Sequence, residues 1–213
     1  MDKVGTFRKL FEACPLIAII RGVEPDEAEA IGEALVGAGI RIVEVPLNSP
    51  RPLDSIARLA KRLEGRALVG AGTVLRPAEV AEVEAAGGGL IVSPSTNPEV
   101  IAATVRAGLV AAPGYFTPSE AFTAIDAGAH ALKLFPAEAA PAAVVKAQRA
   151  VIPRTVPLIV VGGVSPDKMA AYRDAGADGF GLGSSLYRPG QSAAEVGARA
   201  AEFVAALGVE KQR

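Results

Sequence analysis

The stretch LIVSPSTNPEVIAATVRAGLVAA, residues 90–112, decides which fold the chain can adopt. It begins with a continuous apolar run of strand length, residues 90–92, and ends with a second one, residues 109–112. Between the two runs, Pro98 stands at a first helical position and Gly108 follows the last one, where these two residue types favour helix ends. A strand, a helix and a strand in this order predict two parallel strands joined by a crossover helix.

The same unit recurs along the chain, with Pro at the helix entry and usually Gly behind the helix end. Strands are expected at residues 16–20, 41–45, 67–71, 90–92, 109–112, 131–136, 158–161 and 179–182. The helices that follow them are expected to begin at residues 25, 50, 77, 98, 118, 141, 166 and about 192. About eight such units favour a closed (β/α)8 barrel, a TIM barrel of the α/β class, over an open doubly wound sheet.

A short helix is expected before the first strand, because apolar residues recur there at helical spacing. These residues are Val4, Phe7, Leu10 and Phe11. We expect residues 1–14 to pack on the barrel as an N-terminal helix. No linker or low-complexity stretch interrupts the pattern, so residues 1–213 are expected to form a single barrel domain.

Composition excludes several classes of function. Hydrophobic residues make up 50% of the chain and aromatic residues only 5%, so the core must be aliphatic, which suits buried parallel strands. The net charge is -1 with scattered basic residues, so neither nucleic acid nor a membrane is an expected partner. One cysteine, Cys14, and one histidine, His130, provide no intrachain disulfide and no zinc cluster, and both are interpreted as structural. Without a signal-type segment or a long apolar span, the protein is expected in the cytoplasm.

The sixth expected strand carries a charged residue in apolar surroundings. Alternation places Ala131, Lys133 and Phe135 on one face and Leu132 and Leu134 on the other. Burial of an ammonium is costly or lowers its pKa by units. Lys133 is therefore a candidate amine nucleophile, because Schiff-base chemistry needs the neutral amine. The alternative is that Lys133 ends the strand and reaches water.

The second expected strand carries a carboxylate in a similar place. Alternation separates Glu44 from Val43 and Val45, and the helix-facing side of a barrel strand must be apolar, so Glu44 is expected to point inward. An inward carboxylate and an inward amine can form an ion pair or share a proton, which shifts both pKa values toward neutrality. With a carbonyl substrate, Lys133 would form an iminium and Glu44 would move protons. The alternative is a structural buried ion pair.

Glycine-rich segments follow the last two expected strands. They are VGGVSP, residues 161–166, and GLGSS, residues 181–185. Barrels commonly bind a phosphate in these two loops, with backbone N–H groups and a helix N-terminus. Glycine lets the backbone approach the anion closely, and Ser184 or Ser185 adds a hydroxyl. A single Gly-Gly pair usually marks only a turn, but two segments in the two expected loops favour a phosphate site.

Two further side chains at strand ends are candidates for binding a substrate carboxylate. Arg21 follows the first strand and would make charge-assisted hydrogen bonds, unless it only caps the barrel rim. Thr73 follows the segment VGAG and offers a hydroxyl, unless that segment is only a tight strand end. Glu138, after the sixth strand, is interpreted as a solvated residue.

Five ordered segments resemble the 2-keto-3-deoxy-6-phosphogluconate/4-hydroxy-2-oxoglutarate aldolase family, and the likeness runs nearly from end to end. The segments are EVPLNSP (44–50), VGAGTVL (69–75), ALKLFPAE (131–138), VGGV (161–164) and GLGSSLY (181–187). The resemblance implies a class I, metal-independent pyruvate aldolase, which is a carbon–carbon lyase that needs no cofactor.

The resemblance also implies roles for individual residues. Lys133 would be the Schiff-base lysine, Glu44 the general acid/base and Thr73 a ligand of the pyruvyl carboxylate. The residues that would hold the substrate phosphate are Gly163, Gly183 and Ser184. Because family members are often trimers, a homotrimer is expected.

One segment distinguishes branches of the family. Gluconate-type members typically carry Thr-Leu-Arg-Thr after the catalytic Glu, and that Arg binds substrate; here residues 46–49 are PLNS, so the arginine is absent. Arg21 stands where galactonate-type members have a substrate-binding arginine, and residues 16–22 and 186–192 also resemble that branch. The resemblance favours reversible cleavage of 2-dehydro-3-deoxy-6-phosphogalactonate to pyruvate and glyceraldehyde 3-phosphate. The alternatives in the family are 2-keto-3-deoxy-6-phosphogluconate and 4-hydroxy-2-oxoglutarate.

Two readings from other classes remain on the residues alone. A phosphosugar isomerase or epimerase would share the barrel and the phosphate loops but would need no iminium. A non-catalytic barrel that binds a phosphorylated ligand would need neither an iminium nor a proton-transfer group. Neither reading explains why Glu44 and Lys133 should both face inward.

Overall fold

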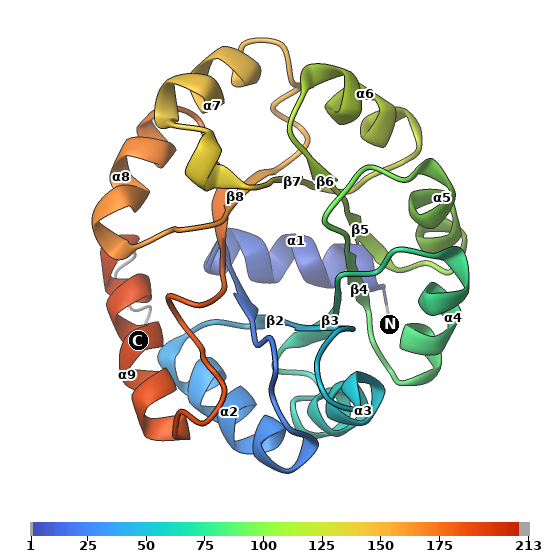
Figure 1. The fold of residues 1–213 in the computed structure, drawn as a ribbon, viewed down its shortest axis with the longest axis vertical. Coiled ribbons are helices and arrows are strands. Elements are labelled where there is room, and N and C mark those ends of the chain that lie inside the picture. Colours follow the sequence, from blue (N-terminus) through green and yellow to red (C-terminus); the bar gives the residue numbers. More distant parts are fainter. Residues whose placement is uncertain (1, 209–213) are drawn as a thin grey trace.

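Parallel strands alternate with helices throughout residues 2–208, the part of the chain that the computed structural model describes (Figure 1). The strands are β1 Leu16–Ile19, β2 Ile42–Pro46, β3 Leu68–Gly72, β4 Leu90–Val92, β5 Val110–Ala112, β6 Gly114–Tyr115, β7 Leu132–Leu134, β8 Leu158–Val161 and β9 Gly179–Leu182. The helices are α1 Lys3–Ala13, α2 Pro25–Ala38, α3 Pro52–Arg62, α4 Pro77–Ala85, α5 Pro98–Arg106, α6 Pro118–Asp126, α7 Ala142–Arg149, α8 Pro166–Asp174 and α9 Ala193–Ala206. A short 3-10 turn, η1 Ala137–Ala139, follows β7.

The strands form one sheet in the order β5-β4-β3-β2-β1-β9-β8-β7-β6, and helices α2 to α9 surround it (Figure 1). The ends of this order, β5 and β6, are two pieces of one short segment that is interrupted at Pro113. The first piece pairs with β4, and the second pairs with β7 with Gly114 opposite Lys133. The ring therefore closes through this segment, and the predicted (β/α)8 barrel is confirmed.

The split of the fifth barrel strand was not predicted from the sequence. The expected strand at residues 109–112 corresponds to β5, but the continuation at β6 was missed. Pro113 has no N–H to donate to a neighbouring strand, which explains the interruption. Its carbonyl still accepts a hydrogen bond of 2.9 Å from the backbone N–H of Lys133, so the neighbouring strand stays in place.

The helix boundaries follow the predicted punctuation. Six helices, α2 to α6 and α8, begin with the prolines at their first turn, as the sequence pattern requires. Helix α3 begins at Pro52 and not directly after Pro50. Gly39 ends α2 with a φ of 110°, a left-handed conformation that glycine adopts without a Cβ clash.

Two apolar clusters lie on opposite sides of the sheet. The larger one fills the layer between strands and helices and includes Leu132 and Leu134 of β7. The smaller one fills the barrel interior and includes Ala131 and, from α1, Phe7 and Phe11. Helix α1 lies across the barrel near the strand beginnings, so the barrel interior is closed at that end (Figure 1).

Candidate active site

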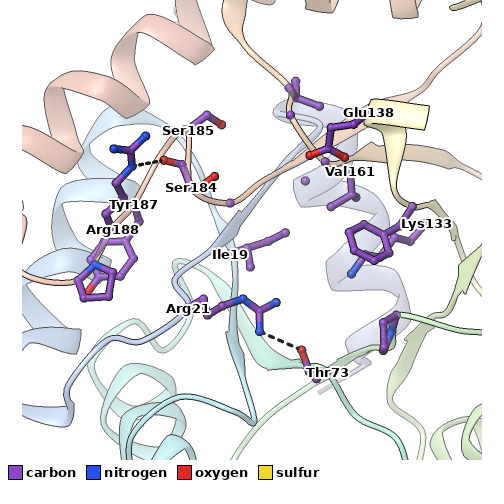
Figure 2. Close-up of a pocket in the computed structure, with 18 residues that line it drawn as sticks. Ile19, Arg21, Thr73, Lys133, Glu138, Val161, Ser184, Ser185, Tyr187 and Arg188 are labelled. Carbon is purple, nitrogen blue, oxygen red and sulfur yellow. Dashed lines mark hydrogen bonds between the residues drawn. The ribbon is translucent and has the colours of Figure 1, made fainter. Parts of the chain in front are cut away.

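A pocket of about 310 Å³ opens at the carboxyl ends of the barrel strands (Figure 2). All but one of the residues predicted to form the site line it. They are Arg21, Thr73, Lys133, Gly163, Gly183 and Ser184. The exception is Glu44, which lies in the barrel interior beside Gly72. The structure therefore brings together side chains and loops that are far apart in the sequence.

Lys133 is buried in the barrel interior, as the alternation predicted. Only 7% of the residue is exposed, although its side chain lines the pocket. Burial lowers the pKa of the Lys133 ammonium; Glu44 opposes this shift and the Arg21 charge adds to it. The ammonium lies 4.9 Å from the centre of the Phe135 ring. The alternative interpretation, a strand-end lysine that reaches water, is wrong.

Glu44 points into the barrel as predicted and is 1% exposed. Burial raises the pKa of the Glu44 carboxyl to about 7, against the opposing charges of Lys133 and Arg21. A side chain at position 72 would collide with this carboxylate, so the glycine of β3 makes room for it.

Within residues 2–208, no salt bridge joins Glu44 to Lys133, and the Oε2 atom of Glu44 has no hydrogen-bond partner. A structural ion pair would be held by direct contact and further hydrogen bonds. The two groups instead act on each other only through their charges. The Lys133 amine, which lines the pocket, and the buried Glu44 carboxylate are therefore not bonded to each other.

Arg21 and Thr73 meet at one side of the pocket. The Arg21 guanidinium donates to the Asn48 side-chain oxygen. It also donates, at 3.4 Å, to the Thr73 hydroxyl (Figure 2). Thr73 has a φ of 57°, a left-handed conformation that is uncommon for a residue with a Cβ and that marks a constrained position. A guanidinium beside a hydroxyl can bind a carboxylate by charge-assisted hydrogen bonds.

The two glycine-rich loops border another side of the pocket. Gly162 and Gly163 follow β8 with φ of 117° and 59°, so residues with a side chain would be strained there. A Cβ at either position would also crowd Glu138. Gly183 and Ser184 belong to the loop after β9. Backbone N–H groups in such loops can surround an anion.

Glu138 was interpreted as a solvated residue, and it is indeed exposed. The structure adds that it lines the pocket beside Gly162 and Gly163 (Figure 2). The sequence missed this position because the turn η1, which carries Glu138 back over the pocket, leaves no periodic signal in three residues.

Tyr187 and Arg188 also line the pocket, and sequence reasoning assigned neither to the site. The Tyr187 ring is buried, which raises the pKa of its hydroxyl to about 12, and nearby Glu27 and Glu24 add to the shift. The Nε of Arg188 donates to the Ser184 carbonyl oxygen at 3.1 Å. Their place directly after the predicted phosphate loop was the available signal.

His130 and Cys14 lie outside the pocket. The Nδ1 atom of His130 accepts a hydrogen bond of 3.0 Å from the Ala111 backbone, which agrees with the predicted structural role. Cys14 is buried. No group of three or more His, Cys, Asp or Glu side chains that could hold a metal ion occurs in the described part of the chain. Among the described helices, none is long and apolar enough to cross a membrane.

Known proteins share both the sequence and the fold. The family model "KDPG and KHG aldolase" matches residues 8–203. The 2-dehydro-3-deoxy-6-phosphogalactonate aldolase of Escherichia coli (strain K12) is 47% identical over 192 residues, which are 90% of this chain and 94% of that protein. A solved structure described as native KDPGal has a TM-score of 0.90 at 47% identity, over 91% of this chain and 94% of that one.

A more distant structure is relevant to the chemistry. It is KDPG aldolase from Legionella pneumophila with pyruvate captured at low pH as a covalent carbinolamine intermediate. It is 27% identical, has a TM-score of 0.79, and the likeness covers 92% of this chain and 96% of that one.

Proposed function

The chain belongs to the KDPG and KHG aldolase family and is thus a carbon–carbon lyase, and from this premise we propose its substrate and the roles of its site residues. The proposed reaction is the reversible cleavage of 2-dehydro-3-deoxy-6-phosphogalactonate to pyruvate and glyceraldehyde 3-phosphate. One observation carries the mechanism: Lys133, buried and with a lowered pKa, shares the barrel mouth with an unbonded Glu44.

Lys133 is the nucleophile in this proposal. Its neutral amine attacks the C2 ketone of the substrate and forms a carbinolamine, which loses water to give an iminium. The lowered pKa supports this role, because it increases the fraction of neutral amine near neutral pH. The covalent carbinolamine named for the Legionella pneumophila enzyme supports the same first step.

Glu44 moves the protons. It gives a proton to the departing carbinolamine oxygen and then, as a carboxylate, accepts the proton of the C4 hydroxyl while the C3–C4 bond breaks. Glyceraldehyde 3-phosphate leaves, the enamine takes a proton at C3, and water releases pyruvate from Lys133. A pKa of about 7 suits a group that both donates and accepts protons near neutral pH.

The rest of the pocket holds the two anionic ends of the substrate. Arg21 and Thr73 bind the carboxylate next to the reacting carbonyl, since the guanidinium and the hydroxyl lie together. The phosphate lies against the glycine-rich loops at Gly163, Gly183 and Ser184, which line the same pocket. One anion at each end would place the C3–C4 bond between them, over Lys133.

Asn48 separates this proposal from the gluconate alternative in the family. By resemblance, members that act on 2-keto-3-deoxy-6-phosphogluconate carry an arginine at this position, whereas here Asn48 accepts a hydrogen bond from Arg21. The relative that is 47% identical is named for the galactonate substrate. The assignment is tested by measuring cleavage of both phosphorylated sugar acids and of 4-hydroxy-2-oxoglutarate; a higher kcat/KM for either alternative would refute it.

We also propose that the protein is a homotrimer and acts in the cytoplasm. Large apolar side chains are exposed at and next to α5 and α6. They are Val105 (39%), Phe116 (37%) and Phe122 (40%). Exposed apolar residues that gather on one side of a protein are typical of interfaces. Light scattering during size-exclusion chromatography tests the trimer, and a monomer at micromolar concentration would contradict it.

The decisive experiment for the chemistry is borohydride reduction of the protein with pyruvate, followed by peptide mass mapping. A reduced pyruvyl adduct on Lys133 is expected. A matched incubation without pyruvate controls for non-specific reduction. If pyruvate binds and no adduct forms, the Schiff-base mechanism is wrong.

A further inference from the structure

Arg188 is a pocket residue that the proposed chemistry leaves without a task. It follows β9 by a few residues and lines the pocket next to Ser184 (Figure 2). Its backbone N–H donates to the Gln191 side chain at 2.7 Å, and its Nε donates to the Ser184 carbonyl oxygen at 3.1 Å. The backbone of Arg188 is therefore tied to the segment after the phosphate loop, and its side chain is tied to the loop itself.

These two bonds do not involve the terminal nitrogens of the Arg188 guanidinium. Within residues 2–208, no carboxylate forms a salt bridge with Arg188. A guanidinium presents five N–H donors in a planar fork, and the Nε bond to Ser184 uses only one of them. The side chain is thus anchored at one nitrogen while its remaining donors stay available at the pocket wall.

Arg199 provides an internal comparison. Its Nε donates to the neighbouring carbonyl of the same loop, Ser185, at 2.9 Å, so both arginines support this loop in the same way. The NH1 of Arg199, however, is paired with Glu202 at 2.7 Å, and Arg199 does not line the pocket. Of these two arginines, only Arg188 lines the pocket.

The charges around the glycine-rich loops indicate what Arg188 could bind. The glycine-rich loops offer backbone dipoles but no charge, and Glu138 places a carboxylate on the wall beside Gly163. Lys168 donates to the Gly163 carbonyl at 3.4 Å and does not line the pocket. A dianion that enters here needs a cation to offset Glu138, and a guanidinium matches the geometry of phosphate oxygens.

We propose that Arg188 binds the phosphate of the substrate and determines the preference for phosphorylated over unphosphorylated aldehydes. The inference rests on the proposed aldolase function and extends it to the specificity of the aldehyde end. Arg188 does not touch the reacting carbon atoms in this proposal. Its effect therefore lies in the KM for a phosphorylated aldehyde.

The test compares R188Q, R188K and R199Q in the direction of aldol addition, with pyruvate and either glyceraldehyde 3-phosphate or glyceraldehyde. For R188Q we expect the ratio of kcat/KM between the two aldehydes to fall about tenfold, mainly through KM, as for a lost charge-assisted hydrogen bond. R188K should recover part of this ratio, since it keeps the charge. R199Q controls for the loss of a loop-supporting Nε bond and should keep the wild-type ratio.

Two results would overturn the inference. An equal loss for both aldehydes in R188Q would show that Arg188 only supports the loop, and an unchanged ratio would leave the phosphate to the backbone alone. Binding of inorganic phosphate to wild type and R188Q, measured by calorimetry, separates this inference from the proposed function. If the wild type turns over neither aldehyde, the proposed function fails, and weaker phosphate binding by R188Q would still support Arg188 as the phosphate ligand, whereas equal binding would reject it.

Discussion

The barrel buries charge in two places and treats it in opposite ways. Near the strand beginnings, Arg149 donates to three backbone carbonyls, those of Pro153, Val156 and Gly176, and pairs with Asp178. At the barrel mouth, Glu44 and Lys133 are as buried, but no salt bridge joins them, and one carboxylate oxygen of Glu44 has no partner within residues 2–208.

The difference separates a structural site from the proposed catalytic one. Burial of an ion is costly in both places, and only hydrogen bonds and opposite charge offset that cost. The hydrogen bonds and the ion pair of Arg149 offset this cost, and they also fix the loop before β8 to the loop before β9. At the mouth the cost remains and appears as the raised pKa of Glu44 and the lowered pKa of Lys133. Such a site lowers the stability of the fold, and the shifted pKa values that result are those that proton transfer and amine attack require.

The largest effect is expected from K133M. Without the amine no iminium can form, so turnover should fall to the uncatalysed background. Because Met fills a similar volume and removes a buried charge that lacks an ion-pair partner, the melting temperature should not fall. K146M, at an exposed position on α7, controls for the substitution itself. Turnover above background in K133M would remove Lys133 from its proposed role.

The second prediction concerns the other group at the mouth. E44Q keeps the shape of the side chain but can neither accept nor release a proton in the same way, so kcat should fall roughly 10²–10⁴-fold. The pyruvyl adduct on Lys133 should still form slowly and be detectable after borohydride reduction. An unchanged kcat would assign the proton transfers to another group.

The same kind of substitution near the strand beginnings should have the opposite outcome. R149M removes the donor to three carbonyls and leaves Asp178 without its cation, so the free energy of unfolding should fall by about 3 kcal/mol. The kcat of the folded protein should stay within about twofold of wild type, since Arg149 does not line the pocket. Urea unfolding and steady-state kinetics on the same preparation measure both. If R149M were as stable as wild type but had a low kcat, the assignment of a purely structural role to Arg149 would be wrong.

Much of this architecture could be predicted from the sequence because it depends on local signals. Proline and glycine punctuate the helices, and the alternation of side chains along β2 and β7 is enough to direct Glu44 and Lys133 into the barrel. Both side chains were recognisable because a charged residue in a buried strand has few structural explanations.

The remainder depended on where loops travel in space. The residues around Glu138 do not indicate that η1 brings it to the pocket, and the place of Arg188 after the predicted phosphate loop does not indicate that the two residues line one pocket. The bond from Arg21 to Asn48 joins the ends of two strands, and its geometry follows from the register of β1 on β2. The missing partner of Glu44 is likewise a property of the assembled barrel, because alternation gives direction and not contact.

The smallest expected effect is a pH dependence of kcat that comes from the residues at the barrel mouth and not from the Arg149 site. Glu44 has a pKa raised from 4.5 to about 7, so below pH 7 it takes up a new proton after it has protonated the carbinolamine oxygen, and as the neutral acid it cannot accept the C4 hydroxyl proton in the cleavage step. The neutral Lys133 amine, although the pKa of its ammonium is lowered, also gains a proton as the pH falls and is then no longer nucleophilic, so both changes act in the same direction. The kcat of cleavage should therefore decrease below about pH 7, by up to tenfold per unit. In E44Q this limb should disappear or move, while in R149M it should stay, because no step of the reaction involves the Arg149 site. A limb with an unchanged midpoint in E44Q would mean that the titrating group is Lys133 alone, and the two mouth residues would then have to be assigned separate tasks.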